Sequence, residues 1–585
     1  MLLLYNTKVK TMIQTGAMIV TTRNFILFTA LTLLLAACGG ADGDSSNENA
    51  GGNMSSGSGD NPLMGRIDAD TAMILANLEP LPDDVLDQLW QPMEAMSASN
   101  LDTYDQMSDE VKAESPVVAA LMKEFSTIDD RESLEALGIH SNGYWAMHMV
   151  SVYPMMHFEL SDRAAFEAML ERVSTNSETD FPTREIDGEE IIWVAEDEMG
   201  IAIHHDERFA TLAVVPDDLS LLRRVAGLDQ ANRPFDSGSL ADFNRQLGYV
   251  AHGSGFVNLQ VIFNQLMDSN NSNAAPARVA MELDGLVNNE ACLNEMDSLL
   301  TLFPRMTMGL TELNENKFDM EFVVEAEDDM AQRLSAIADT PVGLSDTGTQ
   351  TFSGGIAFDV VGARNFAREV VDNWVASPPE CELFSNIAQN ATEWQRALNQ
   401  PIPPVVTNIS GLRVNIDNFV MGDDGQVADA AGTLALFVRN PQMLLGMAQM
   451  FSPELASLGV EPNGAPKPLP AGLIPNMPDL GAFVALSDDA IGLSVGEGQQ
   501  DNLPSALSGS EPDGTVLAYT INYGGYAEFM DKMMSGFNAT QDAGDDELPP
   551  TDFLGQIGDL YDTTSLAIKL TERGIVIESD VVMKQ

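Results

Sequence analysis

Basic residues are scarce in this chain: 29 lysines and arginines stand against 88 aspartates and glutamates, for a formal net charge of −59. Such a charge repels the phosphates of nucleic acids and of anionic lipid head groups, and it favours solubility. The chain also lacks the basic and aromatic stripes with which proteins contact bases and phosphates. We therefore expect no nucleic-acid partner.

The usual catalytic motifs are missing as well. The sequence has no G-x-S-x-G elbow, no H-E-x-x-H helix, no G-x-x-x-x-G-K-[ST] loop and no lysine three residues after a serine. Carboxylates are so abundant that a glycosidase-like pair can be chosen anywhere, so no pair is informative. The sequence predicts no cofactor and gives no positive sign of an enzyme.

Long apolar runs are absent after the N-terminal region, and no later segment approaches the ~18 apolar residues of a membrane-spanning helix. The one early run, residues 25–35, follows Arg23 and is too short to span a bilayer. Small residues then precede Cys38, in "LAAC" (residues 35–38). This order of charge, apolar run, small residues and cysteine is typical of an export signal, and we assign it to residues 1–37.

The same stretch resembles the lipobox of bacterial lipoproteins. The resemblance implies that Cys38 is the mature N-terminus and carries a diacylglycerol thioether, with the further acyl chain that stable anchoring requires. Gly39 follows in place of Asp, which in enteric-type sorting implies the outer membrane, facing either the periplasm or the cell surface. The alternative is an ordinary secretory signal followed by a chance cysteine. Met1, Met12 and Met18 all remain possible start residues.

Residues 38–65 are rich in Gly, Ser and Asn and contain little that could be buried. Such a composition predicts a flexible tether between the membrane and the folded part.

The rest of the chain has the sequence pattern of an internal duplication, with one copy over residues 66–326 and the other over residues 327–585. Strand-helix patterns recur in the same order, for example at 155–173 and 433–451, and each copy ends on a candidate hairpin, at 305–325 and 565–583. Strand-like runs also occur as close neighbours. We predict an α+β fold in which each copy has a mostly antiparallel sheet with helices packed on one face.

All six histidines lie between positions 140 and 252, among several methionines. Imidazoles and thioethers are the ligands that copper prefers, and His148, His157, His204 and His205 are the candidate metal ligands. If segments 146–150 and 155–160 pair as strands, His148 and His157 come close. The alternative is that the methionines pack a sheet–helix interface and the histidines face solvent.

Two cysteines remain once Cys38 is lipidated. In an oxidising compartment an even pair is more often a disulfide than two free thiols, so we predict the bond Cys292–Cys381, which would join the two copies. The alternative is two buried, reduced cysteines that pack as small apolar groups.

Residues 68–84 and 153–170 resemble uncharacterised proteobacterial lipoproteins with duplicated domains of unknown function. That resemblance implies a location and a fold, but it identifies no catalytic residue. We expect a membrane-anchored envelope protein with a non-catalytic binding or structural role, whose ligand is a protein, a glycan or a lipid. The alternatives are an envelope hydrolase that uses carboxylates or a metal-bound water near the histidines, including His252, and a periplasmic copper binder.

Replacement of Cys38 by serine tests the anchor. We expect Cys38→Ser to leave the protein unprocessed or released from the membrane fraction, because the thiol that would carry the lipid is gone. Envelope fractionation and mass spectrometry of the N-terminal fragment measure both effects. Unchanged membrane association, with no lipid mass on that fragment, would contradict the anchor.

Overall fold

The computed structural model describes residues 61–90, 116–196, 199–229, 231, 233–344, 350–421, 427–451, 453–470, 481–526 and 560–584. The chain divides into two compact units. Unit 1 contains the chain up to Leu300 together with Arg305–Glu315, and unit 2 contains Thr301–Pro304 and the chain from Asn316 onward. The predicted signal peptide, Cys38 and most of the predicted tether lie outside the described residues.

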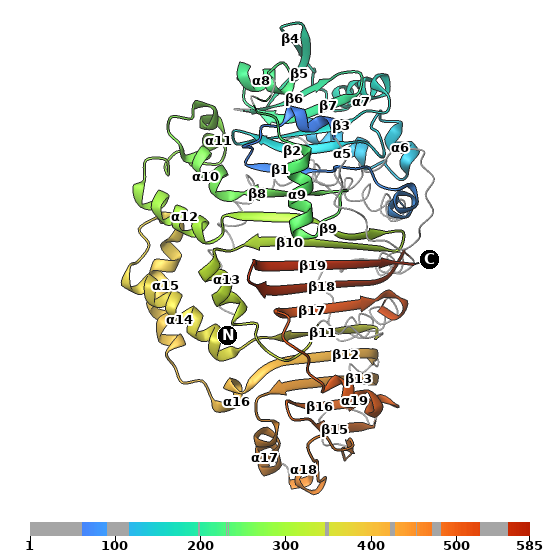
Figure 1. Ribbon diagram of the computed structural model, residues 1–585, viewed down its shortest axis with the longest axis vertical. Coiled ribbons are helices and arrows are strands. Elements are labelled where there is room, and N and C mark those ends of the chain that lie inside the picture. The colour runs from blue at the N-terminus through green and yellow to red at the C-terminus, as the bar shows by residue number, and fades with distance from the viewer. Residues whose placement is uncertain are drawn as a thin grey trace. The chain divides into compact units, whose positions relative to one another are not determined.

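The strands of unit 1 form one antiparallel sheet. They are β1 (Met73–Ala76), β2 (Trp145–Val150), β3 (Tyr153–Glu159), β4 (Thr183–Ile186), β5 (Glu189–Glu196), β6 (Met199–His205), β7 (Phe209–Val215), β8 (Ser254–Asn258) and β9 (Arg305–Asn314). Across the sheet they follow the order β4-β5-β6-β7-β3-β2-β1-β8-β9 (Figure 1). Because β1 pairs with both β2 and β8, the first strand of the unit lies inside the sheet.

Several helices of unit 1 begin at side-chain caps. The helices of this unit are η2 (Pro62–Arg66), a helix over residues 83–90, α5 (Pro116–Phe125), α6 (Arg131–Glu135), α7 (Arg163–Asn176), α8 (Leu219–Val225), α9 (Ser237–Leu247), α10 (Leu259–Met267), η3 (Ser272–Ala274), α11 (Ala275–Ala280) and α12 (Glu290–Leu302). Asp162 caps α7, Asp218 caps α8 and Asn258 caps α10, each with a side-chain oxygen that accepts backbone N–H groups. These caps end the preceding strand segment and start the helix.

Helices pack on both faces of the unit 1 sheet. On one face α5 and α7 bury Met147 and Met156. On the other face α8 packs on Met155, and α9 packs with Ala146. The prediction of helices on one face is therefore wrong for unit 1. Strands β2 and β3 are buried on both sides, as their nearly continuous apolar sequence requires.

The strands of unit 2 form an antiparallel sheet with a closely similar order. They are β10 (Lys317–Glu325), β11 (Phe352–Ala357), β12 (Ile409–Met421), β13 (Val427–Val438), β14 (Lys467–Pro468), β15 (Ala482–Leu486), β16 (Ala490–Val495), β17 (Thr515–Asn522), β18 (Tyr561–Thr571) and β19 (Gly574–Met583). They follow the order β10-β19-β18-β17-β11-β12-β13-β16-β15-β14 (Figure 1). The predicted hairpin at 565–583 is confirmed as β18–β19.

The helices of unit 2 are α13 (Asp328–Ser335), α14 (Val360–Ala376), η4 (Glu382–Phe384), α15 (Ser385–Leu398), α16 (Pro404–Thr407), α17 (Pro441–Phe451), α18 (Pro453–Ser457), α19 (Gln499–Ala506) and a helical stretch over residues 523–526. Helix α19 packs on β13, β15 and β16. Its Leu503, and Leu507 just after it, share a buried cluster with Ala435, Phe437 and Ala485. This cluster is the core on one face of the unit 2 sheet.

The last residues of the predicted tether belong to the folded part. Leu63 and Met64 are buried in a cluster with Ile74, and the Asn61 amide donates to the backbone oxygens of Asn77, at 2.7 Å, and Trp145, at 3.2 Å. Two apolar side chains and one capping asparagine are enough to fix η2 on the sheet. The predicted flexible segment is therefore too long at its C-terminal end.

The α+β class is confirmed, whereas the predicted copy boundaries at 326 and 327 stay a prediction. In the part of the chain that the structure describes, no helix is long and apolar enough to cross a membrane.

Candidate functional site

Two of the predicted metal ligands lie against each other inside unit 1. The Nε2 atoms of His148 on β2 and His157 on β3 are 3.0 Å apart, and the rings stack with centroids 5.1 Å apart. Nδ1 of His157 lies 2.8 Å from the hydroxyl oxygen of Thr211 on β7. The expectation that pairing of β2 with β3 brings these histidines together is confirmed.

Both rings are buried, with 1% of His148 and 2% of His157 exposed. Burial lowers the pKa of His148 to about 3, and the charge of Arg224 adds to the shift. Burial also lowers the pKa of His157 well below its usual value, with further contributions from His148, Arg66 and Arg224. Both imidazoles are therefore neutral at pH 7, so one ring donates and the other accepts in the bond between them.

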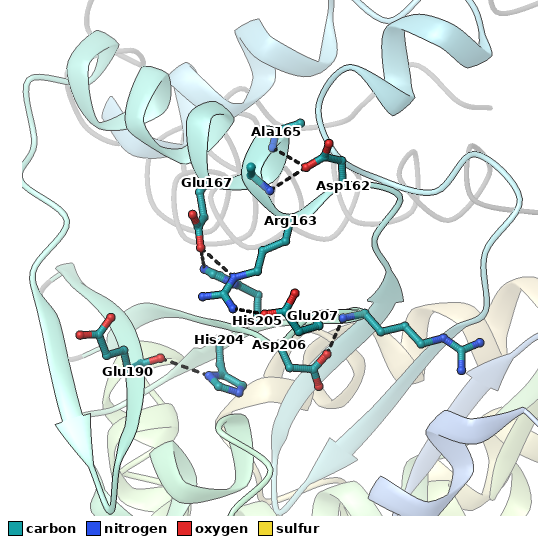
Figure 2. A network of polar contacts seen from close by, with 11 residues as sticks. Asp162, Arg163, Ala165, Glu167, Glu190, His204, His205, Asp206 and Glu207 are labelled. Atoms are coloured by element: carbon teal, nitrogen blue, oxygen red, sulfur yellow. Dashed lines mark hydrogen bonds and ion pairs between the residues drawn. The ribbon is translucent and has the colours of Figure 1, made fainter.

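The other two candidates point to opposite faces of β6, because adjacent residues of a strand alternate. His204 lies on the same face as Thr211, and its Nδ1 is 3.1 Å from the backbone oxygen of Glu190 (Figure 2). His205 lies on the opposite face, edge-on to Phe166, and burial lowers its pKa. Nε2 of His205 is 3.9 Å from a carboxylate oxygen of Glu167.

The four candidate ligands do not converge on one point. Among the described residues, no three His, Cys, Asp or Glu side chains are placed to hold a metal ion. Copper binding has no geometric support in this part of the chain and stays a prediction.

The alternative interpretation of this region is correct for the methionines and wrong for the histidines. Met147, Met155 and Met156 are buried at sheet–helix interfaces, as that interpretation expected. His148, His157 and His204 are buried as well and do not face solvent. The register places His148 beside Met155 on the face that α8 and α9 cover, so the histidines form a polar line inside an apolar layer.

The predicted disulfide Cys292–Cys381 is present, and both cysteines are buried. His140 and His252 bind backbone groups: Nδ1 of His140 accepts from the Asn142 amide, and Nδ1 of His252 lies 3.0 Å from the Glu79 oxygen.

Carboxylates line a pocket of about 340 Å³ in unit 2, where Asp339, Asp513 and Glu572 lie with Gly514 and Thr571. A hydrolase would need a nucleophile, a base or a metal in such a place. The lining offers carboxylates, the hydroxyl groups of Ser335 and Thr571 and apolar groups, and it includes no histidine, lysine or cysteine.

A row of large apolar side chains crosses the unit 2 sheet on one face. One residue comes from each of β10, β19, β18, β17, β11, β12, β13, β16 and β15, and successive residues are direct cross-strand partners, which share a face. We term these residues the apolar row: Phe322, Ile577, Ile568, Leu517, Ile356, Leu412, Leu436, Ile491 and Leu486.

The apolar row is only partly shielded from solvent. Ile356 is 43% exposed, and two neighbours on the same face, Leu434 and Met320, are 40% and 41% exposed. The remaining members of the row are half-buried, except Leu486, which is buried. Adjacent strands thus present a row of Leu, Ile and Phe whose members, apart from Leu486, are each at least partly exposed.

The opposite face of the same sheet carries small and charged residues. Its cross-strand partners, in the same strand order, are Glu321, Glu578, Ala567, Ala518, Gly355, Arg413, Ala435, Gly492 and Ala485. A Cβ at Gly492 would lie 2.7 Å from Leu507, so the segment that includes α19 reaches the sheet because no side chain stands there. The buried cluster of unit 2 lies on this face and contains no member of the apolar row.

Unit 1 has a matching row, and there it is covered. The partners from β9, β8, β1, β2, β3, β7, β6 and β5 are Met308, Gly255, Leu75, Met147, Met156, Leu212, Ile203 and Ile192. Apart from Gly255, every member belongs to or packs against the cluster that α5 and α7 bury. The same face of a similarly ordered sheet is therefore core in unit 1 and half-exposed in unit 2.

Sequence reasoning missed this face. The alternation of Phe318, Met320, Phe322 and Val324 with acidic residues does predict a half-buried strand. It does not tell which side the helices cover, because that depends on segments far away in the chain.

The histidine pair makes the stability of unit 1 sensitive to acid. The folded state holds His148 neutral down to about pH 3, whereas the unfolded chain binds a proton below about pH 6.5. The contribution of neutral His148 to the free energy of unfolding is therefore fully present above about pH 6.5, and it is lost as the pH is lowered from there toward 3. From pH 7 to pH 5 we expect a loss of about 2 kcal/mol from His148, with a further loss from His157.

Urea denaturation of the full chain at both pH values, followed by circular dichroism, measures this loss. The double variant His148→Gln/His157→Gln keeps hydrogen-bonding side chains but cannot titrate, so its pH dependence should be flatter than that of the natural chain. Equal slopes in the two proteins would contradict the assignment.

Comparison with known proteins gives no relative: no protein-family model, no curated protein and no solved structure matches this chain. The resemblance to proteobacterial lipoproteins stays an expectation, and function has to be argued from the geometry described above.

Proposed function

We propose that this protein is an envelope lipoprotein, anchored by Cys38 in the outer membrane, with a non-catalytic binding role. The single observation that carries the binding role is the half-exposed apolar row of unit 2. Monomeric soluble proteins seldom expose large contiguous apolar surfaces unless these contact a partner. The partly exposed side chains of the row stand on a regularly hydrogen-bonded antiparallel sheet, which holds them in fixed positions.

Location rests on two independent features. The lipobox-like residues before Cys38 indicate lipidation, and the Cys292–Cys381 disulfide favours an oxidising compartment over the cytoplasm. The absence of catalytic motifs from the sequence supports a role other than catalysis.

We also propose that the two units arose by duplication. The order β9-β8-β1-β2-β3-β7-β6-β5 in unit 1 corresponds to β18-β17-β11-β12-β13-β16-β15-β14 in unit 2. Helix α7 follows β3 as α17 follows β13, and α8 follows β7 as α19 follows β16. Chance agreement over so many elements is improbable, since order in space and order along the chain both match.

An experimental structure tests the duplication. We expect the matched strands of the two units to superpose in this order, with Met147 of β2 equivalent to Leu412 of β12. Superposition that requires a different strand order, or that places β9 and β18 at unrelated positions, would contradict it.

Site-specific crosslinking in intact cells tests the binding role. A photoreactive residue at Leu434, beside the apolar row, should form an adduct, because a partner that covers the face lies within contact distance. The matched control is Leu383 on η4, which is 54% exposed and lies off the sheet. Adducts at neither position, or the same adducts at both, would contradict binding through this face.

A further inference from the structure

We infer that the apolar row binds the acyl chain of a lipid, which lies across the strands of unit 2. This inference rests on the proposed binding role and adds the chemical class of the ligand. It follows from the composition of the row, its length and the charge of the protein around it.

The row offers hydrocarbon contacts and no charge. Its members are Leu, Ile and Phe, and the exposed neighbours Leu434 and Met320 continue the same chemistry. A glycan needs hydrogen-bond donors and acceptors at its contact surface, and the row has none on its side chains. A ligand that gains free energy here must itself be apolar.

The row is also long enough for a lipid chain. Neighbouring strands lie about 4.8 Å apart, so the row from β10 to β15 extends over roughly 38 Å. One leaflet of a bilayer is about 15 Å of hydrocarbon, half of the ~30 Å core. A fully extended acyl chain therefore fits on part of the row, with side chains under its whole length.

Charge argues against two other occupants, a second copy of the chain and an anionic membrane surface. Two copies of a chain with a net charge of −59 repel each other, and an anionic membrane surface repels the chain for the same reason. A single acyl chain brings apolar area without a second acidic surface. The predicted tether would hold the protein beside a membrane, which is a source of such chains.

The comparison with unit 1 provides an internal reference. Its matching row, which includes Leu75, Met147 and Met156, is covered by side chains of α5 and α7. An acyl chain on unit 2 would cover the apolar row as the side chains of α5 and α7 cover the matching row of unit 1. Both rows are apolar, but among the described residues helices of the same unit cover only the row of unit 1.

Ligand binding to the chain from residue 39 onward, which lacks the lipid and contains both units, tests the inference. Dansyl-undecanoic acid is the fluorescent probe, and monopalmitoylglycerol is the uncharged competitor that should displace it. The variant Ile356→Asp/Leu434→Asp places charges on the face and should weaken probe binding at least 10-fold. Leu383→Asp, the same change off the sheet, should bind within 2-fold of the natural chain.

Circular dichroism shows whether the double variant folds. If it does not, Leu434→Cys labelled with an environment-sensitive dye replaces it, since Cys292 and Cys381 are oxidised and leave one reactive thiol. A blue shift of the dye on addition of monopalmitoylglycerol supports the inference, and an unchanged spectrum overturns it.

Three results overturn the inference: no probe binding by the natural chain, equal binding by the double variant, or a dimer that light scattering detects and that the double variant abolishes. In the last case a second copy covers the row. Crosslinks from Leu434 to a protein or glycan, without acyl binding, would leave the proposed function standing and refute the acyl ligand alone.

Discussion

The cross-strand register of unit 2 is the constraint on which the properties of this sheet depend. Partners such as Ile356 with Leu412, and Leu412 with Leu436, put every large apolar side chain of the row on the same face. A slip by one residue toward the partner on the opposite face would exchange the apolar residue of a strand for Ala, Gly or a charged residue. Both the packing of α19 on small residues and the continuity of the apolar face require that no strand slips.

Charged residues near β10 hold that register in place. Glu321 and Glu578 are direct cross-strand partners, and like charges in such positions repel. Arg573 donates to both carboxylate oxygens of Glu321 at 3.0 Å, and Lys569 lies 2.7 Å from Glu578. Each glutamate thus has its own cation in this alignment, and a shifted strand would separate the pairs.

Local features of the fold were readable from the sequence, whereas features set by distant segments were not. Asp162 and Asn440 mark the starts of α7 and α17, because a side-chain cap acts within a few residues. The closeness of His148 and His157 also follows from a short connection between two strands. Their burial depends on α8 and α9, which come much later in the chain, and so the solvent-facing interpretation failed. The half-exposed row was missed for the same reason: alternation in β10 shows that two faces differ, but only the placement of helices decides which face is covered.

The hydrogen-bonded line from His148 through His157 to Thr211 has a further consequence for how unit 1 can be observed. A ring proton held between two buried nitrogens meets no water while the strands stay closed, so its exchange with solvent requires β2 and β3 to open. Such a proton has a nuclear magnetic resonance signal well apart from those of the backbone amides. The exchange rate of this ring proton therefore reports how often the strands open at the centre of the unit 1 sheet, and its measurement needs no added label.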